Sequence, residues 1–160
     1  MQMNLSTQEE LKIKIDIRAL MGAYVKLADA KNWVELASLF TEKGLFETFS
    51  PEGKLLVMMN GRREIAMVIT ESVGRARVIQ RLYGFDIQIE NDTRAKGVFS
   101  MSDTLIRAID DKPEQTSLNR LPVFRTLHGY GHYHCNYLKI EDKWFIDKLV
   151  QTRTKLDFTF

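Results

Sequence analysis

Two residues near the end of one predicted helix carry side chains that acid–base chemistry uses. Tyr24 and Asp29 lie in the stretch 17–40, which predicts a long helix, a break at 29–32 and a second short helix. Both are expected to face the mouth of a pocket. Burial there would disfavour the charged form of Asp29, raise its pKa and make it a better base near neutral pH. The alternatives are that Asp29 only caps backbone N–H groups and that Tyr24 packs in the core.

The three histidines of the chain form a second candidate cluster. His128, His132 and His134 share one face of a regular strand, whereas Cys135 faces the other way. Three imidazoles on one face invite interpretation as a metal site, but no Asp or Glu lies close by in the sequence. We therefore expect no metal. A histidine of this strand, with His132 as the candidate, is expected to bind the ligand or to supply a base.

Segments with helical periodicity and segments with strand periodicity follow one another along the chain, and they must position these residues. Ser6 or Thr7 can cap the first helix with Glu9 or Glu10 at the capping-box position, and Asn32 can cap the second. A third helix is predicted over 62–77 and a loop over 110–118. Strands are predicted over 44–50, 55–59, 77–90, 93–108, 119–140 and 143–158. Helices followed by a run of strands predict an α+β fold.

Length and charge limit the classes of function. At 160 residues the chain predicts a single domain over 1–160. Its net charge of +2 with mixed signs favours neither nucleic acid nor an anionic membrane as partner. A single cysteine cannot form an intrachain disulfide, and no apolar run is long enough to span a bilayer. We expect a cytoplasmic protein.

Four short motifs, in order, carry a resemblance to a known family. They are Tyr24-(x4)-Asp29-(x3)-Trp33-(x6)-Phe40, then Gly61-Arg62-x-Glu64-Ile65, then Asp86-Ile87-Gln88-Ile89, and last Gly129-Tyr130-Gly131-His132-Tyr133-His134 with Tyr137 and Trp144-Phe145-Ile146. Each is weak alone, but their order and spacing cover nearly the whole chain. The sequence resembles the SnoaL-like branch of the nuclear transport factor 2-like superfamily, which includes bile acid 7α-dehydratases, scytalone dehydratase and hexachlorocyclohexane dehydrochlorinase.

The resemblance implies a cone-shaped α+β barrel, in which three N-terminal helices pack on a strongly bent antiparallel sheet around an apolar pocket. It also implies elimination chemistry without a metal or organic cofactor, run by a helix Asp and a strand His with help from a Tyr and sometimes an Arg. Tyr24 and Asp29 match the helix pair, and Arg153 matches an arginine of the last strand. Gln80 stands where the catalytic histidine is expected.

Gln80 changes what the pocket can do. Its amide cannot titrate, but it can orient a water or a substrate carbonyl. Asp29 would then have to be the base, with Tyr24 or Tyr83 stabilising an oxyanion, as a tyrosine does in ketosteroid isomerase. Gln80 and Tyr83 fall on opposite strand faces unless a bulge intervenes, for which Gly84 is a plausible place.

Three functions are compatible with these residues. The first is a cofactor-independent lyase or isomerase, of the dehydratase type, acting on a hydrophobic ring compound such as a steroid or polyketide. The second is a non-catalytic binding protein for hydrophobic small molecules, as the loss of the histidine would suggest. The third, by fold analogy alone, is a structural subunit like the β subunits of ring-hydroxylating dioxygenases.

A homo-oligomer is also expected, a trimer or otherwise a dimer. The sheet face turned away from the helices is predicted to carry Phe99, Tyr133, Tyr137 and Phe145. A monomer would leave that apolar patch in water.

Overall fold

The N-terminal part of the chain forms three helices. The computed structural model describes residues 4–111 and 120–160. α1 spans Thr7–Asp29, α2 spans Trp33–Ala37 and α3 spans Gly61–Val73. The capping box at the start of α1 is confirmed, because Ser6 Oγ accepts the N–H of Glu9 and the Glu9 carboxylate accepts the N–H of Ser6. No helix among the described residues is long and apolar enough to cross a bilayer.

The third helix is shorter than the predicted 62–77. Gly74 follows its last residue with a φ of +55°. That backbone conformation is readily adopted only by glycine, so the chain leaves the helix there. The Arg77 end of the prediction belongs to the next strand instead.

Six strands form one sheet in the order β2-β1-β6-β5-β4-β3. They are β1 Phe40–Phe49, β2 Leu55–Asn60, β3 Arg77–Ile89, β4 Arg94–Ile106, β5 Thr126–Ile140 and β6 Lys143–Thr159. All neighbours are antiparallel except β1 and β6, which run parallel, so the purely antiparallel sheet that was expected is a mixed one. A parallel pair needs a long crossover, and here the chain from β2 to β5 supplies it. The predicted loop 110–118 lies largely outside the described residues.

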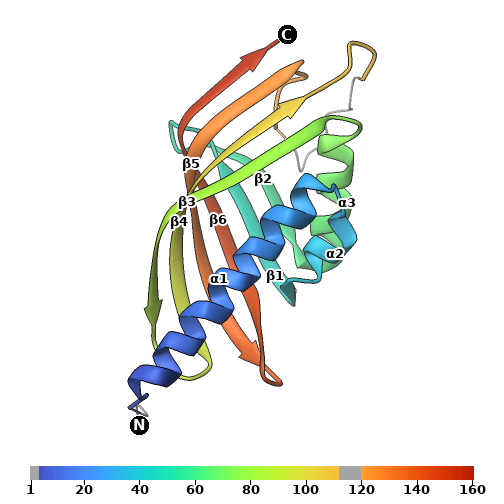
Figure 1. The fold of residues 1–160 in the computed structure, drawn as a ribbon. Helices are drawn as coiled ribbons and strands as arrows, with labels where there is room; N and C mark the ends of the chain where they lie inside the picture. Colours follow the sequence, from blue (N-terminus) through green and yellow to red (C-terminus); the bar gives the residue numbers. More distant parts are fainter. Residues whose placement is uncertain (1–3, 112–119) are drawn as a thin grey trace.

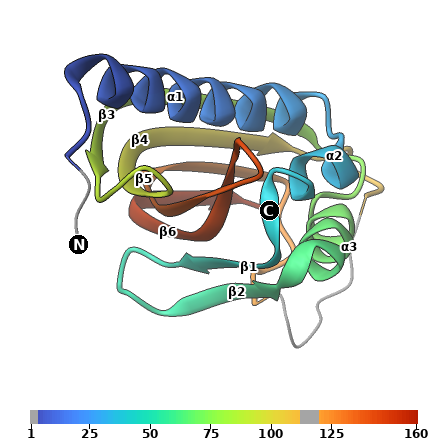
Figure 2. The same ribbon diagram turned by 90° about the horizontal axis from the view of Figure 1, so that it is seen from below.

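The sheet curls so that its two edges approach the helices. Figure 2 shows it bending from β3, which lies beside α1, round to β2, which lies beside α3. α1 runs across the concave side, and α2 and α3 gather at one end of it (Figure 1). The expected cone-shaped α+β architecture is therefore confirmed.

The apolar side chains of the sheet lie on its concave face. Phe99, Tyr133 and Tyr137 are buried in the core with α1, and Phe145 is half-buried. The prediction that these aromatic residues form an outward patch is wrong, because strand parity turns the first three inward. The homo-oligomer that was inferred from them stays a prediction without that support.

Candidate functional site

A cavity of about 110 Å³ lies where the helices meet the concave face of the sheet. Most of its wall is apolar, and all three helices and all six strands contribute side chains. The apolar lining includes Trp33, Phe46, Met59, Val68, Leu105 and Leu127. Tyr24, Tyr133, Gln80, Asp103 and Arg153 line one polar part of the same cavity.

A row of polar positions crosses the sheet beneath this cavity. Gln80 of β3 lies opposite Asp103 of β4, which lies opposite Gly129 of β5. Arg153 reaches across β5 from β6, so that its Nη2 donates to Asp103 Oδ2 at 2.9 Å and its Nη1 donates to Oδ1. The two side chains are only 6% and 7% exposed. Burial lowers the pKa of Arg153, but the Asp103 carboxylate outweighs that effect and the pKa is raised, so the guanidinium stays charged.

Gly129 makes this ion pair possible. A Cβ at that position would lie well under 3.0 Å from Arg153 Nη1 and 2.9 Å from Asp103 Oδ1. Such distances are essentially never adopted by a Cβ and its neighbours. The missing side chain of β5 is therefore the space through which the guanidinium crosses.

The two tyrosines and Gln80 form a buried chain of hydrogen bonds. The Tyr24 and Tyr133 hydroxyls are hydrogen-bonded, and Tyr133 Oη donates to Gln80 Oε1 at 2.9 Å. Burial raises the pKa of Tyr24 well above its ordinary value, with the charge of Tyr133 as the next cause. Burial also raises the pKa of Tyr133, followed by the effect of the Asp103 charge. Both phenols therefore stay protonated at neutral pH and act as donors.

Asp29 is not among the residues that line the cavity. Its Oδ1 accepts the main-chain N–H of Gln80 at 2.7 Å, and its Oδ2 accepts from Arg81 Nη1 at 3.0 Å. The carboxylate is 34% exposed. The predicted position of Asp29 inside the pocket is wrong, because the end of α1 abuts the outer edge of β3 rather than the cavity.

Tyr83 and His132 also lie away from the cavity. The bulge suggested for β3 is present between Leu82 and Phe85, but Tyr83 is 57% exposed and its hydroxyl is hydrogen-bonded to Ser102 Oγ. His132 lies opposite Ser100 on the convex face of the sheet. Neither residue touches the pocket to which it was assigned.

The histidines share that convex face, as the strand parity predicted. His134 Nε2 is 2.9 Å from Thr152 Oγ1, and the His132 and His134 rings are 6.1 Å apart. Partial burial lowers the pKa of His134, and the neighbouring His132 adds to the effect. Within residues 4–111 and 120–160, no three His, Cys, Asp or Glu side chains are grouped to hold a metal ion.

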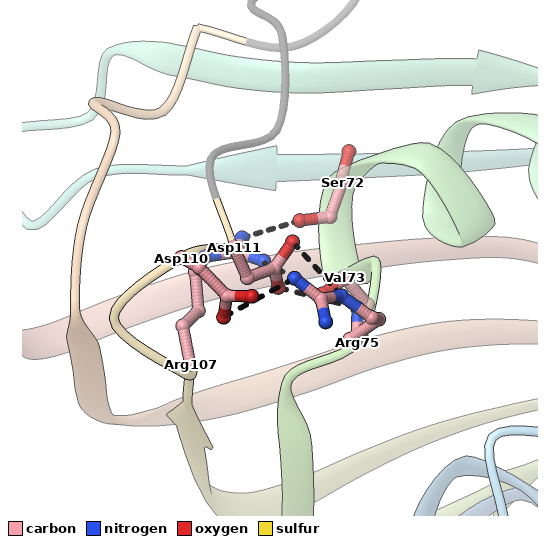
Figure 3. A network of polar contacts seen from close by, with 6 residues as sticks. All are labelled: Ser72, Val73, Arg75, Arg107, Asp110 and Asp111. Carbon is pink, nitrogen blue, oxygen red and sulfur yellow. Dashed lines mark hydrogen bonds and ion pairs between the residues drawn. The ribbon is translucent and has the colours of Figure 1, made fainter.

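A second buried arginine fixes one wall of the cavity. Figure 3 shows Arg107 beneath the end of α3, where its Nη1 donates to the Val73 carbonyl at 2.6 Å and its Nη2 donates to that of Ser72. Asp111 lies 3.4 Å from the same Nη1. Since Ser72 and Val73 line the cavity, Arg107 holds the C-terminus of α3 against the site.

Three residues of the site were not predicted from the sequence: Asp103, Gly129 and Tyr133. Each lies on the apolar face of its strand by simple alternation, as Phe99 and Met101 do beside Asp103. A carboxylate and a glycine on such a face were the available signal. Their meaning depends on Arg153, which only the folded sheet brings across to them.

The chain matches the SnoaL-like domain over residues 9–150. A scytalone dehydratase-like protein of Novosphingobium aromaticivorans superposes with a TM-score of 0.75 at 18% identity, covering 97% of this chain and 93% of its own. A hexachlorocyclohexane dehydrochlorinase of the LinA type 3 from Novosphingobium barchaimii has a TM-score of 0.71 at 13% identity, covering 96% and 94%. These identities show a shared fold. No curated protein matches the chain.

Proposed function

This chain belongs to the SnoaL-like domain family, and we propose that it binds a small, mostly apolar ring compound and acts on it by cofactor-independent elimination or isomerisation. The observation that supports the proposal is the pairing of an apolar wall with one polar end that holds two phenols, an amide and a buried ion pair. Apolar pockets with a few placed polar groups are typical of small-molecule sites.

The size of the cavity limits which ligands can fit. Its volume of about 110 Å³ is close to that of an engineered protein cavity of about 150 Å³ that takes up benzene. A single ring therefore fits better than the fused rings of a steroid. The two proteins of the same fold are named as a scytalone dehydratase and a hexachlorocyclohexane dehydrochlorinase, and elimination is the chemistry that we propose for this chain.

Asp103 takes the role of proton acceptor that the sequence suggested for Asp29. Among the described residues that line the cavity, it is the one carboxylate. In the proposed step an Asp103 oxygen removes a proton from the carbon beside a carbonyl, and the electron pair of that C–H bond moves to the carbonyl oxygen. Donors at the polar end stabilise the oxyanion. Return of the proton to another carbon completes an isomerisation, while loss of hydroxide or halide from the next carbon completes an elimination.

A non-catalytic binding protein is the second candidate. It is favoured by Arg153, which occupies both oxygens of Asp103, and by the cavity lining, whose described residues include no imidazole. A paired carboxylate is a weaker base than a free one. Binding without turnover is the outcome that would support this candidate.

Deuterium exchange separates the two functions. Cyclohexanone in D₂O is incubated with the protein, and loss of the proton signal beside the carbonyl is followed by NMR. The enzyme function predicts exchange above the buffer rate, which Asp103→Asn reduces by roughly 10²–10⁴-fold, the usual contribution of a general base.

Asp103→Asn leaves the buried Arg153 without its partner, so a second variant is needed. Asp103→Asn with Arg153→Gln removes both charges together. If this variant binds cyclohexanone but does not exchange it, Asp103 is the base. Binding by wild type with no exchange would leave only the binding function, and absence of any binding would contradict both.

A further inference from the structure

We infer that Gln80 selects the ligand, because its side-chain nitrogen is held as a hydrogen-bond donor for a neutral carbonyl oxygen. This inference rests on the proposed function of the cavity and names the chemical class of its ligand. It concerns the position at which the histidine of related enzymes was expected.

The orientation of the amide is fixed by the tyrosines. Tyr133 Oη donates its hydrogen to Gln80 Oε1 at 2.9 Å. The Tyr133 hydroxyl is itself hydrogen-bonded to that of Tyr24. Because Oε1 accepts the Tyr133 hydrogen bond, Nε2 is the polar atom of the amide that remains for a ligand.

The backbone of Gln80 is fixed as well. Asp29 Oδ1 accepts its N–H at 2.7 Å, and Arg81 Nη1 donates to its carbonyl oxygen at 2.6 Å. Gln80 lies on an edge strand, where backbone groups often lack partners. Here both backbone polar groups are bound, so the residue is held at its main chain and at one end of its side chain.

The amide nitrogen itself is unpaired. Gln80 is 8% exposed and lines the cavity, yet no described residue accepts a hydrogen bond from its Nε2. The neighbouring carboxylate of Asp103 is bound to Arg153 instead. This donor is open to the cavity and is not enclosed by protein, so a ligand that brings an acceptor gains a hydrogen bond there.

The charges around Gln80 favour a neutral acceptor over an anion. Asp103 and Arg153 cancel each other, and both Nη atoms of the guanidinium are occupied by the Asp103 oxygens. Among the described lining residues Arg153 is the one cation; Asp103 neutralises it, and only its buried Nε lacks a partner. A ketone or ester oxygen on a single ring meets these requirements.

Three probes of one shape test the inference by NMR titration of the full chain. Cyclohexanone has only an acceptor, methylenecyclohexane has neither donor nor acceptor, and cyclohexanol has both. Wild type is expected to bind cyclohexanone roughly tenfold more tightly than methylenecyclohexane, as one net hydrogen bond allows. Cyclohexanol should fall between them, because its own hydrogen needs an acceptor.

Gln80→Met keeps the side-chain volume and removes the donor, so the tenfold ratio should fall to about one. Tyr133→Phe frees Oε1, lets the amide turn and should also reduce the ratio. Gln88→Met is the matched control, because Gln88 is exposed on the same strand β3 and does not line the cavity, so its loss should leave the ratio unchanged. The affinities of the probes are compared as a ratio because general damage to the fold weakens the binding of all probes alike.

Each outcome decides the inference. Equal affinity of wild type for cyclohexanone and methylenecyclohexane would overturn it while leaving the pocket function intact. An unchanged ratio in both Gln80→Met and Tyr133→Phe would do the same. If none of the three probes binds wild type, the proposed function fails and the inference fails with it.

Discussion

Asp29 holds Gln80 by its main chain and not by its side chain. The carboxylate at the end of α1 accepts the Gln80 N–H at 2.7 Å, over a separation of 51 residues along the chain. Arg81 closes the arrangement by donating to Asp29 and to the Gln80 carbonyl. Asp29 is therefore an anchor for the edge strand that carries a cavity residue, and Gln80 is that residue.

Loss of the Asp29 anchor should destabilise the fold. Asp29→Ala leaves the Gln80 N–H without its partner, and we expect it to lower the free energy of unfolding by about 1–3 kcal/mol in urea titrations. Asp16→Ala is the matched control, because Asp16 lies on the exposed part of α1 in a surface pair with Lys12 and should cost under about 1 kcal/mol. Equal losses in the two variants would contradict the anchor.

Gly129 should be intolerant of a side chain because of Arg153. Gly129→Ala places a Cβ in the path of the guanidinium, breaks the pair with Asp103 and should cost about 3 kcal/mol. In the background Asp103→Asn with Arg153→Gln the shorter side chain leaves that space free, so the same change should cost far less. Gly22→Ala, where no atom lies within 4 Å, controls for the substitution itself. The double-mutant cycle is measured by urea unfolding, and additivity would argue against the proposed crowding.

Alkaline pH should weaken the fold through Cys135. Burial raises the pKa of this thiol from 9.0 to about 12, although the neighbouring Tyr137 hydroxyl acts to lower it. The unfolded thiol loses its proton near pH 9 while the folded thiol keeps it. Its contribution to stability is therefore complete below about pH 9 and is lost as the pH rises toward 12, by about 1.4 kcal/mol per pH unit.

The measurement is the free energy of unfolding at pH 8, 9, 10 and 11 for wild type and Cys135→Ala. The variant should be less stable at pH 8 because it loses packing. Above pH 9 its free energy of unfolding should fall less steeply with pH than that of wild type, by the slope that one proton contributes. Parallel curves would show that the thiol does not titrate as its burial requires. The buried Tyr24, Tyr133 and Tyr137, with pKa values also raised by burial, should keep some decline in both proteins.

Removal of Arg107 should loosen the wall that α3 gives to the cavity. Arg107→Met strips the Ser72 and Val73 carbonyls and Asp111 of their buried cation and should cost about 3 kcal/mol in thermal or urea unfolding. Arg75→Met is the control, since Arg75 is 64% exposed in its pair with Asp110 and should cost under about 1 kcal/mol (Figure 3). Similar stability of the two variants would show that burial adds nothing to the Arg107 contacts.

Local chemistry in the sequence determined the elements of this protein. The capping box at Ser6 and the N-cap at Asn32 are present as predicted, because each is satisfied by backbone groups only three residues away. Strand alternation placed the three histidines on one face for the same reason, since the direction of a side chain depends only on its position in the strand. Cavity residue Tyr24 could also be identified, because helical periodicity turned it inward.

Only the tertiary structure decided which carboxylate enters the cavity. Nothing in the sequence distinguishes the Asp29 carboxylate from that of Asp103. In the fold, Asp29 contacts the edge of β3 and Asp103 contacts Arg153 across a glycine. Each of these contacts joins residues about 50 positions apart. The parallel pairing of β1 and β6, in a sheet that was predicted to be antiparallel, belongs to the same class of long-range contact. Such contacts depend on the curl of the sheet and on the seat of α1 against it, and no spacing along the chain encodes either.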